Sequence, residues 1–250
     1  MPDSSSDLQK ALAEHRASEP HGRGVGLYIH DIVYGANDGI VTTFAIVSGV
    51  NGAELAPYVV VILGLANVLA DGLSMGLGNF LSSRSKRDNY RRLLKEERQE
   101  VEEIPEIERE EIREIYRKKG FSGADLEAAT RVITADKKVW VDTMMREEHG
   151  LTPEDSDHAA LHGLVSFVAF IVFGLIPIAP YLFPLSPESR FPVTIVATGF
   201  ALLLVGFLRS WVTRERIFRG PLEILFIGTV CAVAAYVVGA MLRGFVGVAL

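Results

Sequence analysis

Long apolar stretches alternate with polar segments along the chain, and five of these stretches are long enough to cross a lipid bilayer. A transmembrane helix needs about 20 predominantly apolar residues. The segments that reach this length are residues 31–50, 58–81, 159–182, 192–212 and 221–247. The first is the least apolar, because Asp31, Asn37 and Asp38 interrupt it. The pattern predicts an all-α, polytopic membrane protein with five transmembrane helices.

A dense block of charge, residues 84–157, separates the second and third predicted spans. It holds 20 of the 31 acidic residues and 16 of the 25 basic residues of the chain. One helix is expected to continue out of the second span as far as Glu103, and Pro105 suits the first turn of a second helix. Gly120 is expected to end that helix, and Gly150 to end a third. The block is therefore predicted to be a three-helix insert between spans 2 and 3.

The distribution of Lys and Arg orients the predicted spans, because cytoplasmic loops carry an excess of both. The insert carries 16 basic residues, whereas the loops on the opposite side together hold only Arg190. The N-terminus and the insert are therefore predicted to be cytoplasmic. The expected organisation is a polar cytoplasmic arm, two spans, the cytoplasmic helical insert and three further spans, at residues 1–27, 28–83, 84–157 and 158–250.

Composition excludes several classes of protein and site. The net charge of −6 leaves no basic footprint for a nucleic acid. The single cysteine, Cys231, lies in an apolar run, so neither a disulfide framework nor a thiolate metal site is expected. Residues 1–26 lack an apolar core, so no cleavable signal peptide is expected.

Polar residues recur inside the first two predicted spans. Asn67, Asp71, Met75 and Asn79 are spaced four residues apart and share one helix face, and Asp38 lies near the centre of the first span. An ionised carboxylate inside the bilayer costs roughly 3 kcal/mol, and neither span holds a Lys or Arg to pair with it. A bound cation would supply the missing partner, and a nearby thioether suits a softer divalent metal. The alternative is that these polar groups hold helices together.

The acidic part of the insert is a second candidate metal site. Residues 96–114 include ten Glu and three Arg. Two pairs of glutamates spaced three residues apart share a helix face, and two methionines and a glutamate lie close together near the end of the insert. These candidates are Glu100, Glu103, Glu111, Glu114, Met144, Met145 and Glu148. Such ligands suit Fe²⁺ or Mn²⁺, but a solvated charged helix would show the same run of glutamates.

Several ordered motifs resemble the vacuolar iron transporter family of Fe²⁺ and Mn²⁺ transporters. They are HDIVYGANDG at residues 30–39, ADGLSMG at 70–76, PE at 105–106 with EIREIY at 111–116, and MMREEHG at 144–150. The resemblance extends from about residue 28 to the C-terminus. It implies five spans in each subunit of a homodimer, and proton antiport that removes Fe²⁺ or Mn²⁺ from the cytosol.

The resemblance also implies roles for individual residues. Asp38 and Met75 match the intramembrane metal-handling pair, and the seven candidates in the insert match a cytoplasmic metal-binding set. Asn79 stands where many family members have Glu, and Asp71 where they have a small residue, so Asp71 is expected to supply the carboxylate. No prosthetic group is implied, only the transported ion. The membrane would be the plasma or inner membrane of a bacterium, or the vacuolar membrane of a eukaryote.

Two other classes of membrane protein are alternatives to a transporter. A di-iron oxidase needs Glu-x-x-His or clustered-His motifs, and no Glu in the chain has a His three residues later. An enzyme is therefore not expected. A metal-gated cation channel or a metal-sensing membrane protein remains the alternative to a transporter, because its acidic insert would look the same.

Overall fold

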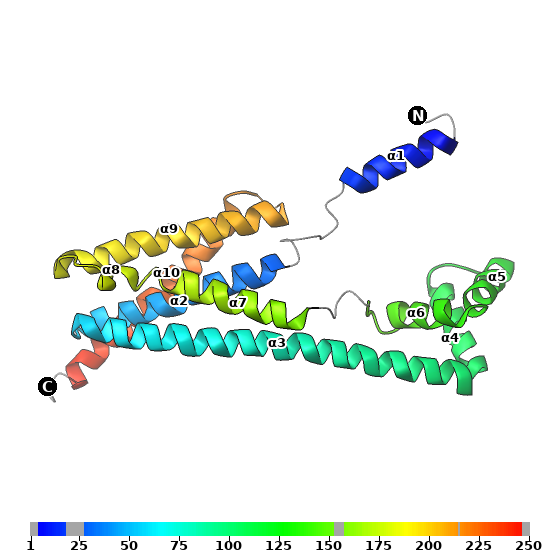
Figure 1. Cartoon of the computed structure of the whole chain (residues 1–250), viewed down its shortest axis with the longest axis horizontal. Helices are drawn as coiled ribbons and strands as arrows, with labels where there is room; N and C mark the ends of the chain where they lie inside the picture. Colours follow the sequence, from blue (N-terminus) through cyan, green and yellow to red (C-terminus); the bar gives the residue numbers. More distant parts are fainter. Residues whose placement is uncertain (1–4, 19–27, 153–157, 215, 247–250) are drawn as a thin grey trace. The chain divides into compact units, whose positions relative to one another are not determined.

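The computed structural model describes residues 5–18, 28–152, 158–214 and 216–246, and its regular elements in these ranges are helices, with no strand (Figure 1). Residues 19–27 of the expected arm and 153–157 of the charged block lie outside the described residues. The chain divides into two compact units, one comprising Met1–Gly76 and Leu164–Leu250 and the other Leu77–Gly163. Most of the expected membrane spans belong to the first unit, and the expected insert belongs to the second.

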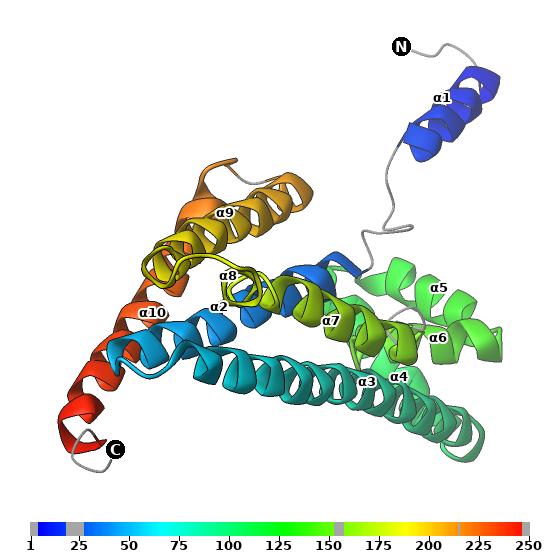
Figure 2. The ribbon, with the colours of Figure 1, turned by 60° about the vertical axis from the view of Figure 1, so that its left-hand side comes forward.

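The first unit is built mainly from apolar helices. They are α2 (Ile29–Gly52), the first part of α3 (Pro57–Glu103), most of α7 (Ala159–Gly174), α8 (Ala179–Leu182), α9 (Pro187–Thr213) and α10 (Arg219–Val246). The unit also includes α1 (Ser5–Ser18), which is a polar helix. Helix α2 packs against both α9 and α10, which also pack against each other (Figure 2). The buried residues at this contact include Ile40 of α2, Leu202 of α9 and Ile224 of α10.

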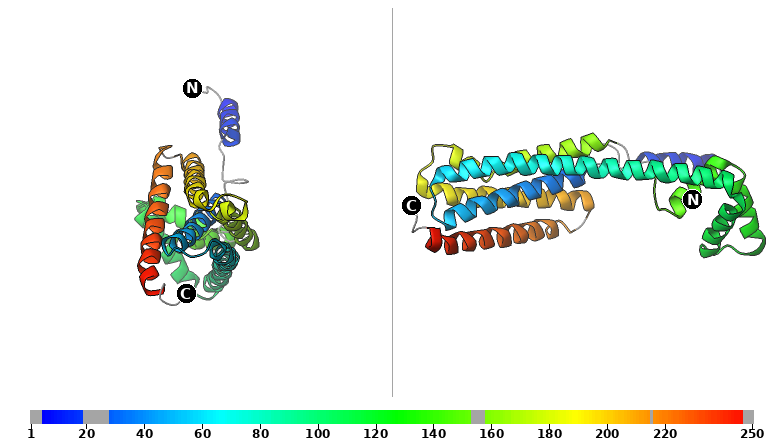
Figure 3. Two further views of the ribbon diagram at one scale, coloured as in Figure 1. Left: turned by 90° about the vertical axis from the view of Figure 1, so that its left-hand side faces the viewer. Right: turned by 90° about the horizontal axis from the view of Figure 1, so that it is seen from below.

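Glycines bring α2 backbone to backbone against its neighbours. The end-on view in Figure 3 shows the ribbon of α2 beside those of α9 and α10. A Cβ added at Gly35 would lie 2.6 Å from the carbonyl oxygen of Ser166, and one added at Gly39 would lie 2.5 Å from that of Phe170. Small residues at helix contacts allow such an approach within a membrane. The segment of α2 that carries Asp38 is therefore held directly against α7.

Three helices among the described residues are long and apolar enough to cross a membrane: α3, α9 and α10. Helix α2 is not among them, because Asp31, Asn37 and Asp38 dilute its apolar sequence. The third predicted span, residues 159–182, is not one helix. Helix α7 ends at Gly174, and the chain turns before α8 in a segment that includes Pro177, whose backbone nitrogen has no hydrogen to donate.

The second unit contains the end of α3 with α4 (Pro105–Lys118), α5 (Gly123–Thr134) and α6 (Lys137–Glu147) (Figure 1). The predictions that one helix continues from the second span to Glu103, and that the next begins at Pro105, are confirmed. The prediction of a single third helix is wrong, because α5 and α6 are separate. The Asp136 carboxylate accepts hydrogen bonds from the backbone nitrogens of Lys138 (2.8 Å) and Val139 (3.1 Å), so it caps a new helix.

Candidate metal site

A shared apolar core fixes the helices that carry the candidate site. All four helical segments of the insert contribute buried residues to it: Val101 from α3, Ile112 from α4, Ile133 from α5, and Trp140, Val141, Met144 and Met145 from α6. Glu97 precedes Val101 by four residues and Glu108 precedes Ile112 by four, so each glutamate lies on the helix face that packs inward. These two glutamates are only 3% and 2% exposed.

Carboxylates from three helices converge next to this core. Ligand atoms of Glu97, Glu100 and Glu108 all lie within 4.8 Å of one another, and so do those of Glu97, Glu148 and His149. Glu97 belongs to both groups, and the Nε2 atom of His149 lies 2.8 Å from its Oε1 atom. The glutamates Glu97, Glu100, Glu108, Glu111 and Glu148 are called the glutamate cluster below.

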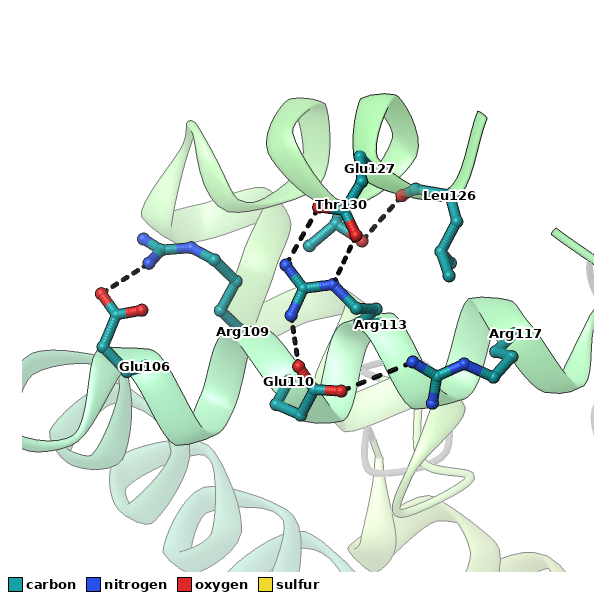
Figure 4. A network of polar contacts seen from close by, with 8 residues as sticks. All are labelled: Glu106, Arg109, Glu110, Arg113, Arg117, Leu126, Glu127 and Thr130. Atoms are coloured by element: carbon teal, nitrogen blue, oxygen red, sulfur yellow. Dashed lines mark hydrogen bonds and ion pairs between the residues drawn. The ribbon is translucent and has the colours of Figure 1, made fainter. Parts of the chain in front are cut away.

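Several other charged residues of the insert form ion pairs on its outer surface. Figure 4 shows one network, in which Arg113 donates to Glu127 at 2.9 Å and also to Glu110, while Arg109 donates to Glu106 at 2.7 Å. Hydrogen bonds from Arg113 lower the pKa of the Glu127 carboxyl. Five of the ten glutamates in residues 96–114 thus form ion pairs with Arg or Lys: Glu96, Glu102, Glu106, Glu110 and Glu114.

The glutamate cluster has no such neutralisation. Among the described residues, none of its five members forms an ion pair with Lys or Arg. One oxygen of Glu97 and one of Glu108, both named Oε2, are buried without a hydrogen-bond partner in the described structure. Burying such groups unsatisfied is unfavourable, so the cluster is suited to a positively charged ligand.

The same environment shifts the acidity of the cluster. Burial, followed by repulsion from Glu111, Glu97, Glu100 and Glu148, raises the pKa of Glu108 to about 7. Burial also raises the pKa of Glu97 and of Glu111, and other carboxylates of the cluster add to both shifts. A bound divalent cation would lower these pKa values, since it favours the ionised form of every carboxylate near it.

The structure brings together some of the ligands expected from sequence and leaves others apart. Glu100, Glu111 and Glu148 are in the cluster, whereas Met144 and Met145 lie in the apolar core beside it, 0% and 1% exposed. Glu103 is exposed and accepts a hydrogen bond from Gln99 at 2.8 Å. Glu114 is exposed and pairs with Lys118 at 2.8 Å, and this hydrogen bond lowers its pKa.

Sequence reasoning missed three members of the two groups: Glu97, Glu108 and His149. Glu97, Glu100 and Glu103 are spaced three residues apart, and so are Glu108, Glu111 and Glu114. Either pair within each triplet satisfies the spacing rule. The missing signal is the apolar residue four positions after Glu97 and Glu108, which marks the inward face of each helix.

The candidates in the expected spans lie within the first unit. Asp38 on α2 and Asp71 and Met75 on α3 are each half-buried, and the two carboxylates are within electrostatic reach of each other. Two amide atoms near them, Asn37 Oδ1 and Asn67 Nδ2, are buried without a hydrogen-bond partner among the described residues. Polar groups of both helices thus remain unsatisfied at this level.

Comparison with known proteins gives this arrangement a family. The sequence model of the VIT family matches residues 29–240. The chain belongs to the VIT family. Vacuolar iron transporter 1 of Eucalyptus grandis is 30% identical to this VIT-family chain over 230 residues, which are 92% of this chain and 91% of the relative. The match to the family model includes α2, α3 and the whole insert.

Two further relatives of the VIT-family chain show the same breadth. Vacuolar iron transporter 1 of Arabidopsis thaliana is 31% identical over 228 residues, covering 91% of this chain and 90% of the relative. The vacuolar iron transporter of Toxoplasma gondii is 36% identical over 251 residues, covering 96% and 82%. The resemblance noted in the motifs is thereby confirmed over most of the chain.

Proposed function

We propose that this chain is a membrane transporter that removes Fe²⁺ or Mn²⁺ from the cytosol, and that the glutamate cluster captures the ion. The observation that carries this proposal is the glutamate cluster itself: five carboxylates without a Lys or Arg partner among the described residues, two of them almost completely buried. Carboxylate oxygens suit divalent ions of this kind. Membership of the VIT family and the names of the relatives support transport of iron.

In this proposal, Asp38, Asp71 and Met75 carry the ion through the membrane. A carboxylate at this level holds either a proton or a metal ion, because both bind the same oxygens. Competition between them at one site is the simplest physical route to proton antiport. The Met75 thioether would favour a softer divalent ion over Ca²⁺ or Mg²⁺.

We further propose five membrane-crossing segments, formed by α2, α3, α7 with α8, α9 and α10, in a homodimer with a cytoplasmic insert. The half-buried positions of Asp38 and Asp71 support a partner subunit. A carboxylate exposed to lipid costs roughly 3 kcal/mol, and a second copy that covers this surface would remove part of that cost.

Metal flux into proteoliposomes tests the role of the spans. With the wild-type protein, we expect Fe²⁺ and Mn²⁺ uptake that accelerates under an opposing pH gradient, accompanied by proton flux. The Asp38→Asn variant removes the charge that binds the ion and the proton, so both fluxes should fall at least about tenfold. The exposed Asp142→Asn in the insert is the matched control and should transport normally.

The same assay separates the proposal from its alternative. A rate of metal flux that does not depend on the pH gradient would indicate a metal-gated channel. Unchanged metal-dependent proton flux in Asp38→Asn would contradict the proposed role of that carboxylate. Competition between Fe²⁺ and Mn²⁺ in this assay ranks the two ions.

A further inference from the structure

The end of helix α6 holds a histidine in a fixed position beside the glutamate cluster. The helix ends at Glu147, and Gly150 follows in the left-handed region at φ +64°. The backbone nitrogen of His149 donates to the carbonyl oxygen of Met144 (3.4 Å), and that of Leu151 donates to Met145 (2.9 Å). Because the two methionines are buried in the core and Leu151 packs against it, the backbone that carries His149 is anchored on both sides.

The His149 side chain has the geometry of a metal ligand. Its Nε2 atom lies 2.8 Å from Glu97 Oε1, and Glu148 offers a carboxylate oxygen within 4.8 Å of both residues' ligand atoms. Two ligands at right angles, each about 2.1 Å from one ion, are about 3 Å apart. The separation of the nitrogen and the Glu97 oxygen therefore already matches that of two adjacent ligands on one ion.

A simple hydrogen bond accounts for only part of this arrangement. It satisfies Glu97 Oε1, but Glu97 Oε2 remains buried without a partner in the described structure. The group also contains two carboxylates for one imidazole, and Glu97 is at the same time close to Glu100 and Glu108. An ion bound between His149, Glu97 and Glu148 would supply the positive charge that this hydrogen bond leaves missing.

We propose that His149 supplies a nitrogen ligand to the divalent ion captured by Glu97 and Glu148, so that this site has mixed nitrogen and oxygen coordination. The proposal rests on the proposed function of the glutamate cluster and adds a determinant of its specificity. Imidazole suits Fe²⁺ and the later divalent ions such as Co²⁺ and Ni²⁺, whereas a site made only of carboxylates also suits Mn²⁺. His149 therefore shifts the capture site away from Mn²⁺ and toward Fe²⁺.

Pulsed electron paramagnetic resonance of the full-length protein loaded with one equivalent of Mn²⁺ tests the ligand directly. A histidine nitrogen bound to Mn²⁺ modulates the echo at the ¹⁴N frequencies, and labelling the histidines with ¹⁵N changes those frequencies without any substitution. We expect this modulation in the wild-type protein and in His158→Gln, a matched change of an exposed histidine outside the cluster. It should be absent in His149→Gln.

Affinity provides the second measurement. Loss of a ligand should weaken binding of Co²⁺, used as a stable probe with similar ligand preference to Fe²⁺, by at least about tenfold, and more than it weakens binding of Mn²⁺. Mn²⁺ that binds the wild-type protein without nitrogen modulation would overturn the role of His149 and leave the carboxylate site standing. Failure of the wild-type protein to bind Mn²⁺ or Co²⁺ at all would instead overturn capture by the glutamate cluster.

Discussion

Individual glutamates of the insert differ in their surroundings far more than in their sequence context. Glu108 and Glu114 lie on the same helix, six residues apart, yet burial and neighbouring carboxylates raise the pKa of the first to about 7, while a hydrogen bond from Lys118 lowers the pKa of the second. The inward-facing Glu108 thus lies among other carboxylates, whereas the outward-facing Glu114 is paired with a lysine.

This difference predicts how the metal-free insert responds to pH. The pKa of Glu108 is higher in the folded protein than in an unfolded chain, so its contribution to stability is present at low pH and is lost as the pH rises through about 7. In chelator, lowering the pH from about 8 to about 6 should therefore raise the thermal midpoint of the insert. Glu108→Gln should raise the midpoint at the higher pH and flatten this dependence.

Fluorescence of Trp140, which is buried in the core of the insert, reports this unfolding once Trp211→Phe has removed the other tryptophan. Glu114→Gln is the matched control. Since its pKa is lowered, removing its charge should leave the midpoint unchanged or lower it slightly. A midpoint for Glu108→Gln that falls at high pH would contradict the repulsion within the cluster.

The sequence predicted a gathering of glutamates in the insert and named three that lie in the cluster, Glu100, Glu111 and Glu148, but it missed Glu97 and Glu108. Glutamates three residues apart are interchangeable by spacing alone, and only the tertiary contacts of Val101 and Ile112 decide which lie inward. The sequence did not identify His149 as a member of the site either, because its contact with Glu97 joins residues 52 positions apart in sequence.

The sequence predicted helix boundaries correctly where a strong local signal marks them and missed those that depend on a weak signal. Pro105 set the start of α4, and a continuous run of helix-forming residues predicted α3. The break between α5 and α6 depends on one capping side chain, Asp136, whose effect is hard to see in a helical sequence. The break after α7 follows from Gly174 and Pro177 within an otherwise apolar stretch.

Glycine contacts between α2 and α10 predict where the first unit is least tolerant of change. A Cβ added at Gly239 would collide with the backbone carbonyl oxygen of Gly49, so Gly239→Ala should force the two helices apart and lower the thermal midpoint in detergent. Gly199→Ala on α9 is the control, because a Cβ there meets nothing within 4 Å and alanine favours a helix. Equal midpoints for the two variants would show that α2 and α10 do not pack this closely.

In the chain as a whole, helices long and apolar enough to cross a membrane occur together with the glutamate cluster in one member of the VIT family. Helix α3 belongs to both units: it supplies Asp71 and Met75 to the first, and Glu97 and Glu100 to the second. Neither part is sufficient for transport in the proposed function. The proposal assigns capture to the glutamate cluster and passage across the membrane to Asp38 with its neighbours on α3.

Fe²⁺ uptake into proteoliposomes at increasing Fe²⁺ concentration determines whether the inward-facing glutamates capture the transported ion. Two double variants remove the same number of charges from the same two helices: Glu97→Gln with Glu108→Gln, and Glu103→Gln with Glu114→Gln. We expect the first to raise the Fe²⁺ concentration for half-maximal uptake at least about tenfold and the second to leave it unchanged. If instead only the outward-facing pair raises this concentration, the inward-facing glutamates do not capture the ion.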